Sequence, residues 1–501
     1  MTPGMDTWLL SRMQELRDLQ GLIGLATWDM ETYLPSKAGP ARSHQLSTLQ
    51  GLHHERLVDP RLGDALAQAA TQKGLSDDAR AMVAVLTRER EREVRVPAPL
   101  VKALAGAVSD AIPAWREARQ ARRFAVFQPA LQRLLSLRRE QADAYGHDGE
   151  RYDALLEGHE PGMRVARLTP VLSALREHLI PMVGKLSAVR RPVAPFLMGR
   201  HYDKDAQWAF TLRLLKDFGF DLEAGRQDLS IHPFTGGTHP LDVRLTTHVD
   251  TATPFPAIFS TIHEVGHGLY EQGFSVEHHR TPLAAAPSMG LHESQSRLWE
   301  NMVGRSLPFW RHYFPVLRAA FPEALSGTDV ETFHAAVNAV GPSLIRIESD
   351  EVTYNLHIAL RYELELLLVR DELPVDELPA AWNARMEKYL GVTPPDDTQG
   401  VLQDIHWAWG ELGYFPTYSL GNLYAASLYR AAKRDLPDLE AQFGRGELLP
   451  LRDWLRTHVH QHGFRLSAEE RVRQVTGQGL TDTDFLAYLR EKYGALYGVS
   501  L

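Results

Sequence analysis

Two histidines and a glutamate stand at a spacing that suits a metal ion. Residues 263–267 read His-Glu-Val-Gly-His, which places His263 and His267 four residues apart with Glu264 beside the first. On an α-helix, side chains four positions apart share one face, so both imidazoles can bind one ion. Glu264 can then act as general base on a water molecule at that ion. The chain contains no Cys. The ligands of any transition-metal site must therefore come from His, Asp and Glu.

The surrounding sequence predicts the helix that this spacing requires. Pro254 and Pro256 precede the motif, residues 257–272 contain no proline, and Gly273 follows in the position of a C-cap. The five residues alone are weak evidence, because such a motif arises by accident in roughly one chain in fifteen to twenty of this length. A third ligand is therefore the stronger test.

A second predicted helix lies between Pro287 and Pro308 and carries Glu293 and Glu300. An acid from this helix would complete the two-histidine, one-glutamate set of a catalytic zinc ion and leave the fourth position for water. The spacing does not choose between the two glutamates. A structural zinc site would normally need four protein ligands, and these motifs supply three and a base.

Most of the chain has the apolar pattern of helices. Apolar residues recur at intervals of three and four, as at Leu131, Leu134 and Leu135, and period-two alternation is scarce. The exception is the region 231–249, where we expect a short β-hairpin with its turn at residues 235–238. The sequence therefore predicts a mainly α fold with a small β-hairpin or sheet just upstream of the metal motif.

We expect one domain over residues 1–501, because no repeat at a fixed period is present. The stretch 190–196, which contains two prolines, is expected to separate two lobes. The N-terminal helical lobe would cover about 1–195, and the lobe with the metal motif about 196–501.

Composition and charge narrow the range of partners. The formal net charge of −9 disfavours a nucleic-acid partner or an anionic membrane, since both favour a basic surface. Apolar runs are far shorter than the roughly 20 residues that cross a bilayer, and residues 1–20 lack the order of a secretory signal. We therefore expect a cytoplasmic protein that acts on peptides or small molecules.

Further motifs follow one another along the chain. They are Trp28-Asp29, Pro35 with Arg42, His54-Glu55, residues 232–234 (His-Pro-Phe), 242–246 (Asp-Val-Arg-Leu-Thr), 263–267, 292–301, 346–351 and 403–407 (Gln-Asp-Ile-His-Trp). In this order, and nearly end to end, the chain resembles the carboxypeptidase Taq family of metallocarboxypeptidases. One departure is Ser349, where the family usually has alanine, and it concerns only local packing near Arg346.

The resemblance implies a large, two-lobed helical fold with a deep substrate groove, similar to neurolysin-like and angiotensin-converting-enzyme-like peptidases. It also implies Glu293 as the third ligand, zinc or sometimes cobalt as the ion, and a homodimer as the usual assembly. The activity that it implies is the removal of C-terminal residues from peptides with broad specificity.

Stabilisation of the oxyanion in peptide hydrolysis calls for a hydrogen-bond donor near the ion. Our candidates are His406, within the motif 403–407, and Tyr418, with Tyr414 as a close competitor. The alternative for each is a packed aromatic residue whose polar tip is satisfied locally.

Two arginines are candidates for binding the substrate. Arg346, expected at the start of a helix over 344–368, can hold the terminal carboxylate of a peptide by a bidentate pair. The alternative is a salt bridge to Asp350, and the resemblance favours the first. Arg244 is either an exposed residue of the hairpin or, as the resemblance implies, part of the groove that limits substrate length. We expect structural or surface roles for the remaining histidines near the site, which are His232, His239, His248, His278 and His279.

We therefore expect a zinc-dependent metallocarboxypeptidase with Glu264 as general base. A zinc endopeptidase, oligopeptidase or aminopeptidase with the same centre is an alternative, because metal and base do not determine where a peptide is cut. A helical metal-binding protein without activity is another.

Overall fold

The computed structural model describes residues 5–189 and 199–501, and within them it is mainly helical, with a small sheet upstream of the metal motif. The fold class expected from the sequence is thus confirmed. The α-helices are α1 Thr7–Thr32, α2 Gly39–Val58, α3 Pro60–Thr71, α4 Asp77–Arg95, α5 Ala98–Ala121, α6 Gln128–Tyr145, α7 Arg151–Leu156, α8 Val165–Ala188, α9 Lys204–Phe218, α10 Phe255–Glu271, α11 Met289–Arg297, α12 Leu307–Ala320, α13 Val330–Val337, α14 Tyr354–Arg370, α15 Leu378–Leu390, α16 Pro416–Asp435, α17 Leu439–Gly444, α18 Leu449–His458, α19 Ala468–Thr476 and α20 Thr483–Tyr497. The strands are β1 Gly225–Leu229, β2 Thr235–His239 and β3 Asp242–Thr247.

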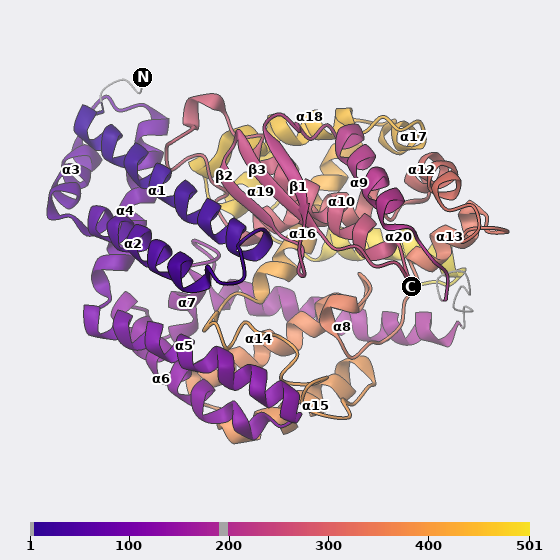
Figure 1. The fold of residues 1–501 in the computed structure, drawn as a ribbon, viewed down its shortest axis with the longest axis horizontal. Coiled ribbons are helices and arrows are strands. Elements are labelled where there is room, and N and C mark those ends of the chain that lie inside the picture. Colours follow the sequence, from indigo (N-terminus) through magenta and orange to yellow (C-terminus); the bar gives the residue numbers. More distant parts are fainter. Residues whose placement is uncertain (1–4, 190–198) are drawn as a thin grey trace.

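The helices gather in groups around α16, which runs through the middle of the molecule (Figure 1). Helices α1 to α4 lie together at one end, and α5, α6, α14 and α15 lie at the bottom of the view. A small core joins the first group, whereas one large core runs from α5 to α20. The expected lobe boundary at residues 190–196 lies outside the described residues, so the division into two lobes stays a prediction.

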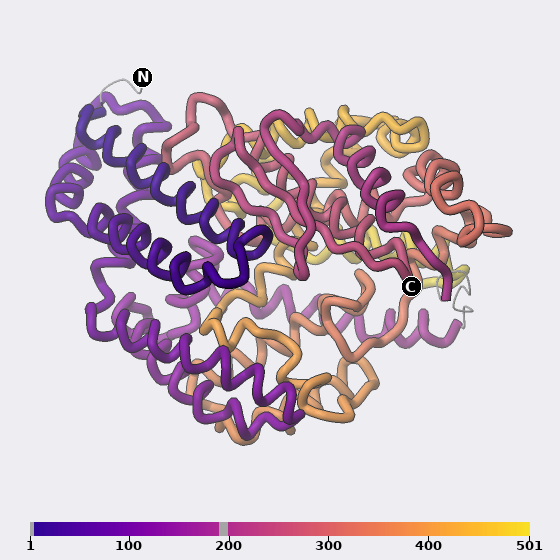
Figure 2. The backbone as a smooth tube through the Cα atoms, viewed as in Figure 1, coloured from indigo at the N-terminus to yellow at the C-terminus, as the bar shows by residue number. Residues whose placement is uncertain are grey.

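The sheet has the order β1-β3-β2, with β1 parallel and β2 antiparallel to β3. The predicted hairpin is present as β2 and β3, but its turn was placed wrongly, because residues 235–238 belong to β2. Helix α1 lies against β2 (Figure 2), and glycines of α1 allow this close packing. A Cβ atom added at Gly21 of α1 would lie 2.5 Å from the carbonyl oxygen of Thr238.

The metal motif lies on α10, within two residues of the helix bounds expected from the sequence. Gly273 is not the predicted C-cap, because the helix is capped at Gln272 and Gly273 has no positive φ. A Cβ atom at Gly273 would lie 2.5 Å from Cβ of His460, so this glycine makes room for a neighbouring side chain. Across residues 5–189 and 199–501, no helix combines the length and apolar character needed to cross a bilayer.

Candidate active site

Three potential metal ligands converge between α10 and α11. The Nε2 atoms of His263 and His267 lie 3.6 and 3.4 Å from the same atom, Oε2 of Glu293. A tetrahedral zinc ion with ligand bonds of about 2.0–2.1 Å holds neighbouring ligand atoms about 3.3 Å apart. Donor type and spacing therefore both fit a zinc ion at this point.

Two glycines allow the helices to approach closely enough for this convergence. A Cβ atom at Gly266, inside the metal motif, would lie 2.6 Å from the carbonyl oxygen of Gln295 on α11. A Cβ atom at Gly421 on α16 would lie 2.5 Å from Cγ of Glu293. The backbone of α10 and that of α16 thus press on α11 from two directions, which fixes where Glu293 points.

Hydrogen bonds behind the candidate ligands fix their ring orientation. Nδ1 of His263 lies 2.9 Å from Oε2 of Glu300. The spacing in the sequence did not decide between Glu293 and Glu300, and the structure places Glu300 as a hydrogen-bond partner of the ligand His263, outside the candidate metal set. Nδ1 of His267 lies 2.6 Å from Nδ1 of His292, whose Nε2 lies 2.8 Å from Oε1 of Glu271. His263 can donate from Nδ1 to Glu300, and His267 can donate from Nδ1 to His292, which in turn donates from Nε2 to Glu271. With these hydrogen bonds, Nε2 of His263 and of His267 each keeps a lone pair for a metal.

Two of the candidate ligands, Glu293 and His267, have surroundings that favour the protonation states that bind a cation. Arg297 donates to Glu293 at 2.7 Å and to Glu300 at 3.1 Å. Although burial opposes it, Arg297 and His263 hold the pKa of Glu293 well below its usual range. Burial, assisted by His292, lowers the pKa of His267 to about 3. An anionic glutamate and a neutral histidine are the forms that a metal requires.

Glu264 is buried beside the metal set and is held from the sheet. The hydroxyl of Thr235 on β2 lies 2.6 Å from Oε2 of Glu264. Burial raises the pKa of this carboxyl, which makes it a better proton acceptor once ionised. No hydrogen bond from a residue in 5–189 or 199–501 reaches its other oxygen, Oε1.

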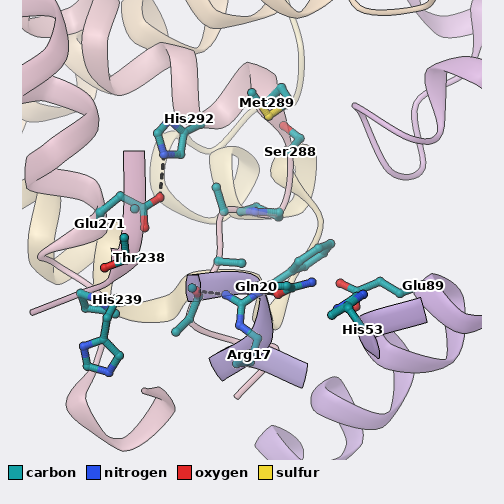
Figure 3. Close-up of a pocket in the computed structure, with 18 of the residues that line it drawn as sticks. Arg17, Gln20, His53, Glu89, Thr238, His239, Glu271, Ser288, Met289 and His292 are labelled. Carbon is teal, nitrogen blue, oxygen red and sulfur yellow. Dashed lines mark hydrogen bonds and ion pairs between the residues drawn. The ribbon is translucent and has the colours of Figure 1, made fainter. Parts of the chain in front are cut away.

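A cavity of about 1070 Å³ adjoins the metal set, and Thr235 and His292 form part of its wall. Figure 3 shows His292 and Glu271 on one side of this space and His53 and Glu89 on the other. Its lining comes from α1, α4, the sheet and the segment 284–289, so it extends well beyond the metal set. It has the size of a binding site for several substrate residues.

A buried cationic cluster lies on another side of the site. Arg346 donates from Nη2 to Asp404 at 2.7 Å and from Nη1 to the hydroxyl of Tyr354 at 2.8 Å. Arg361, which is fully buried, pairs with the other oxygen of Asp404 at 2.6 Å. Among the described residues, no further carboxylate lies within ion-pair distance of either guanidinium. Two cations thus share one anion, and the cluster carries a net charge of about +1.

Tyr354 connects this cluster to the metal set. Its ring lies 4.5 Å from the guanidinium of Arg297, the partner of Glu293, while its hydroxyl accepts from Arg346. The guanidinium of Arg346 also lies 4.8 Å from the ring centre of Tyr418. The cationic cluster is therefore linked to the candidate metal ligand Glu293 through Tyr354 and Arg297.

Comparison with known proteins shows which family this chain resembles. A family model described as carboxypeptidase Taq (M32) metallopeptidase matches residues 8–493. Thermostable carboxypeptidase 1 of Thermus thermophilus is 45% identical over 502 residues, with 98% of each chain covered. Carboxypeptidase 1 of Bacillus subtilis is 35% identical, with 95% of each chain covered. The crystal structure of an M32 carboxypeptidase from Deinococcus radiodurans R1 gives a TM-score of 0.96 at 42% identity and covers 98% of this chain and 99% of that chain.

The chain belongs to the carboxypeptidase Taq (M32) family. It is therefore a metallocarboxypeptidase, as the resemblance in its sequence implied. The helical fold is that of the solved members of the family, since the match extends over nearly the whole length of both chains.

The structure brings together the two candidates for oxyanion stabilisation. Nε2 of His406 lies 3.1 Å from the hydroxyl of Tyr418, and the ring of Tyr414 lies 5.4 Å from that of Tyr418. Burial raises the pKa of both tyrosines, and the charge of Glu293 contributes in the same direction. Both phenols thus keep their proton at neutral pH and can donate it in a hydrogen bond. Burial lowers the pKa of His406 to about 4, so this imidazole is neutral.

The surroundings of Arg346 differ from the sequence-based expectation. Arg346 lies in a short 3₁₀ turn, Arg346–Glu348, and the following helix begins only at Tyr354. The helix predicted over 344–368 therefore started too early. The alternative partner was also wrong, because Asp350 accepts hydrogen bonds from the backbone of Val352 and Thr353 at the start of α14, and Arg346 pairs with Asp404.

Arg244 lies on β3 as expected, but it is not an exposed strand residue. Its guanidinium lies 4.3 Å from the ring centre of Trp28 on α1, and it donates to Asp242 at 2.9 Å. Asp242 in turn borders the large cavity. The pair therefore joins the sheet to α1 at the wall of that cavity.

Sequence reasoning missed the residues that hold the candidate catalytic groups. Thr235 had been assigned to a turn, so its contact with Glu264 was not foreseen. A signal for Glu271 was present, because it follows His267 by four residues and so lies on the same helical face. No sequence signal marked Tyr354 or Arg361, since their partners come from segments far away in the chain.

Proposed function

We propose that this chain uses one zinc ion to remove C-terminal residues from peptides, with broad side-chain specificity. His263, His267 and Glu293 hold the ion, with cobalt as a possible substitute. The proposal is carried by the buried cluster of Arg346, Arg361 and Asp404, because its unbalanced positive charge can bind an anion beside the metal set.

A free terminal carboxylate distinguishes the last residue of a peptide from every internal one. In a desolvated groove an unpaired carboxylate is costly, so an exopeptidase working from this end needs a fixed cation. Arg346 can supply it, because Nη1 and Nη2 each use one hydrogen in the bonds described above and each has a second. Arg361 and Asp404 hold this guanidinium in place, and they limit its freedom to swing away.

In the remaining steps of the proposed mechanism, each side chain either transfers a proton or stabilises a charge. A bound zinc ion supplies a Lewis acid that polarises the scissile carbonyl and makes water more acidic. Glu264, held by Thr235, takes the proton of the attacking water and later delivers it to the departing amine. Tyr418, with His406 at its hydroxyl, donates a hydrogen bond to the developing oxyanion.

The upstream part of the peptide occupies the cavity of about 1070 Å³ in this proposal, since that space opens beside Thr235 and His292. Arg244 lies at its wall with Asp242 and would limit the length of peptide that fits. We further propose a homodimer located in the cytoplasm, in line with the family resemblance. Gel filtration with light scattering tests the assembly, and a molecular mass of one chain would contradict it.

Two measurements test this function. Metal analysis of protein purified from metal-replete cells should find about one zinc ion per chain, and chelation should abolish activity that zinc or cobalt restores. One peptide with free and with blocked termini should then be digested and the product masses read over time. Stepwise loss of single residues from a free C-terminus supports the proposal, whereas internal fragments would indicate the endopeptidase alternative. Loss of single residues from the N-terminus would indicate an aminopeptidase.

A further inference from the structure

The C-terminal helix contacts the segment that holds the candidate metal site. Helix α11 continues into a π-helical turn, Leu298–Val303, which contains Glu300. Such turns free backbone groups from the regular helical pattern. The carbonyl oxygen of Asn301 in this turn accepts a hydrogen bond from Nζ of Lys492 at 3.2 Å. It also lies 3.0 Å from the hydroxyl of Tyr488, whose single hydrogen is shared between Asn301 and Glu351.

Both donors on α20 are themselves anchored to a buried carboxylate. The hydroxyl of Tyr488 lies 3.0 Å from Oε2 of Glu351, and Lys492 forms an ion pair with the same residue. Tyr493, also on α20, donates to Glu351 at 2.7 Å but makes no hydrogen bond to Asn301 among those described. Glu351 is 7% exposed and follows Arg346 by five residues, within the motif 346–351.

We propose that Tyr488 and Lys492 are positioning residues for the metal ligand His263. They act through the carbonyl of Asn301, which adjoins Glu300, the residue at Nδ1 of His263. The proposal rests on the proposed metal site, and it assigns the C-terminal helix a part in metal binding that neither metal motif reveals.

The packing leaves little room for the turn to move without moving Glu300. Asn301 and Glu300 are both buried, and Arg297 and Arg305 bind the two oxygens of Glu300 at 3.1 Å each. If either donor on α20 is lost, the buried carbonyl of Asn301 keeps only one partner on that helix, and the turn is held less firmly. A shift of the turn then lengthens the 2.9 Å contact between Glu300 and His263, which sets the ring of that ligand.

Tyr488, Lys492 and Glu351 also connect the segment that carries Arg346 with the segment that carries a metal ligand. Glu351 belongs to the segment that carries Arg346, while Asn301 belongs to the segment that carries the third metal ligand. Lys492 and Tyr488 bridge these segments directly. A purely structural role for α20 would stabilise the fold but would not change the affinity of the folded protein for its metal.

Two matched tyrosine variants separate these roles. Tyr488→Phe and Tyr493→Phe each remove one hydroxyl that contacts Glu351 from the same helix, but only the first also contacts Asn301. The zinc dissociation constant of each metal-free variant should be measured by competition with a chromogenic chelator, together with its thermal midpoint. We expect similar losses of thermal stability in both.

Zinc affinity should differ between the two. Tyr488→Phe should weaken zinc binding by about 2- to 30-fold, the range for residues that act through others, and Tyr493→Phe should remain within about twofold of wild type. A second variant, Lys492→Met combined with Glu351→Gln, avoids a lone buried charge, and methionine fits because Lys492 borders a cavity of about 520 Å³. It should weaken zinc binding as Tyr488→Phe does. Equal zinc affinities in all variants and wild type would overturn this inference alone, whereas a wild type without zinc affinity would contradict the metal site itself.

Discussion

The hydroxyl of Thr235 lies 2.6 Å from Oε2 of Glu264. This contact ties the carboxylate on α10 to the edge strand β2, which lies against α1. One oxygen of the candidate base is therefore engaged by a fixed donor. The other makes no hydrogen bond to a described residue, so in the proposed mechanism it is the oxygen that takes a proton from water.

Removal of the base should separate metal binding from turnover. In Glu264→Gln the candidate ligands remain, so zinc content should be unchanged, while kcat should fall by about 10²- to 10⁴-fold. Thr235→Val removes only the donor, and we expect a smaller loss of about 10- to 100-fold. Steady-state kinetics and metal analysis on the same preparations check this. Full turnover in Glu264→Gln would exclude this residue as the base.

The substitutions Glu293→Gln and Glu300→Gln should have different effects on zinc binding. Glu293→Gln removes a ligand and should abolish stoichiometric zinc binding. Glu300→Gln removes the acid behind His263 and should weaken zinc binding by about 10- to 100-fold, with activity restored by excess zinc. Chelator competition measures both constants. If Glu300→Gln lost zinc more completely than Glu293→Gln, the two roles would be reversed.

Much of the fold and of the candidate site followed from local sequence. The helical spacing of His263 and His267, with prolines before them, specified a helix with both rings on one face, and α10 has this form. Gly236 and Gly237 gave a misleading signal. They favour a turn in isolation, but here they lie within β2, which pairs with β3 and packs against Gly21 and Gly24 of α1.

The rest depended on contacts between distant segments. Arg346 and Asp404 are far apart in the chain, and nothing in either motif marks them as a pair. The local alternative, Asp350, has the right spacing for an ion pair only if a helix begins at Arg346, and Asp350 itself starts that helix later by accepting from Val352 and Thr353. Pairing preferences of this kind are decided by tertiary packing.

Arg244 should affect the dependence of activity on peptide length. Arg244→Ala removes the contact with Trp28 and the pair with Asp242 at the cavity wall, so longer peptides should become better substrates relative to short ones. Arg226→Ala is a matched control, because Arg226 also stacks near Trp28 and pairs with Asp228 on the neighbouring strand β1. Specificity constants on a ladder of peptides measure the effect. The same profile in both variants would return Arg244 to a structural role.

Glu160 should make stability depend on pH. It is 1% exposed, and burial raises its pKa to about 8, although Ser288 and the backbone of Gly290 oppose this. The folded state therefore keeps a proton that the unfolded state, with a pKa near the ordinary value of 4.5, releases. The contribution of Glu160 to the free energy of unfolding should fall as pH rises from about 4.5 to about 8, and stay constant outside that window.

Glu160→Gln should remove this dependence, since an amide does not titrate in that range. Denaturant unfolding at about pH 5.5 and about pH 8 should show the variant gaining on wild type by on the order of 3 kcal/mol at the higher pH. Parallel pH profiles for the two proteins would show that Glu160 is not the group responsible.

Recognition of the terminal carboxylate by Arg346 is the central claim about direction of attack. Arg346→Ala leaves Arg361 with Asp404, so the local charge becomes balanced and the bidentate donor is lost. Removing one member of a buried charge pair costs about 2 to 5 kcal/mol, which corresponds to a loss in kcat/KM of roughly 30-fold to several thousand-fold on peptides with a free C-terminus. Zinc content should not change.

The most direct measurement compares one peptide as its free acid and as its C-terminal amide, with wild type and with Arg346→Ala. Wild type should cleave the acid far faster than the amide, because only the acid brings the anion that the cluster of Arg346, Arg361 and Asp404 lacks. In Arg346→Ala the ratio of the two specificity constants should fall close to one. If the variant keeps the full preference of wild type for the free acid, another cation reads the terminus, and the account given for Arg346 is wrong.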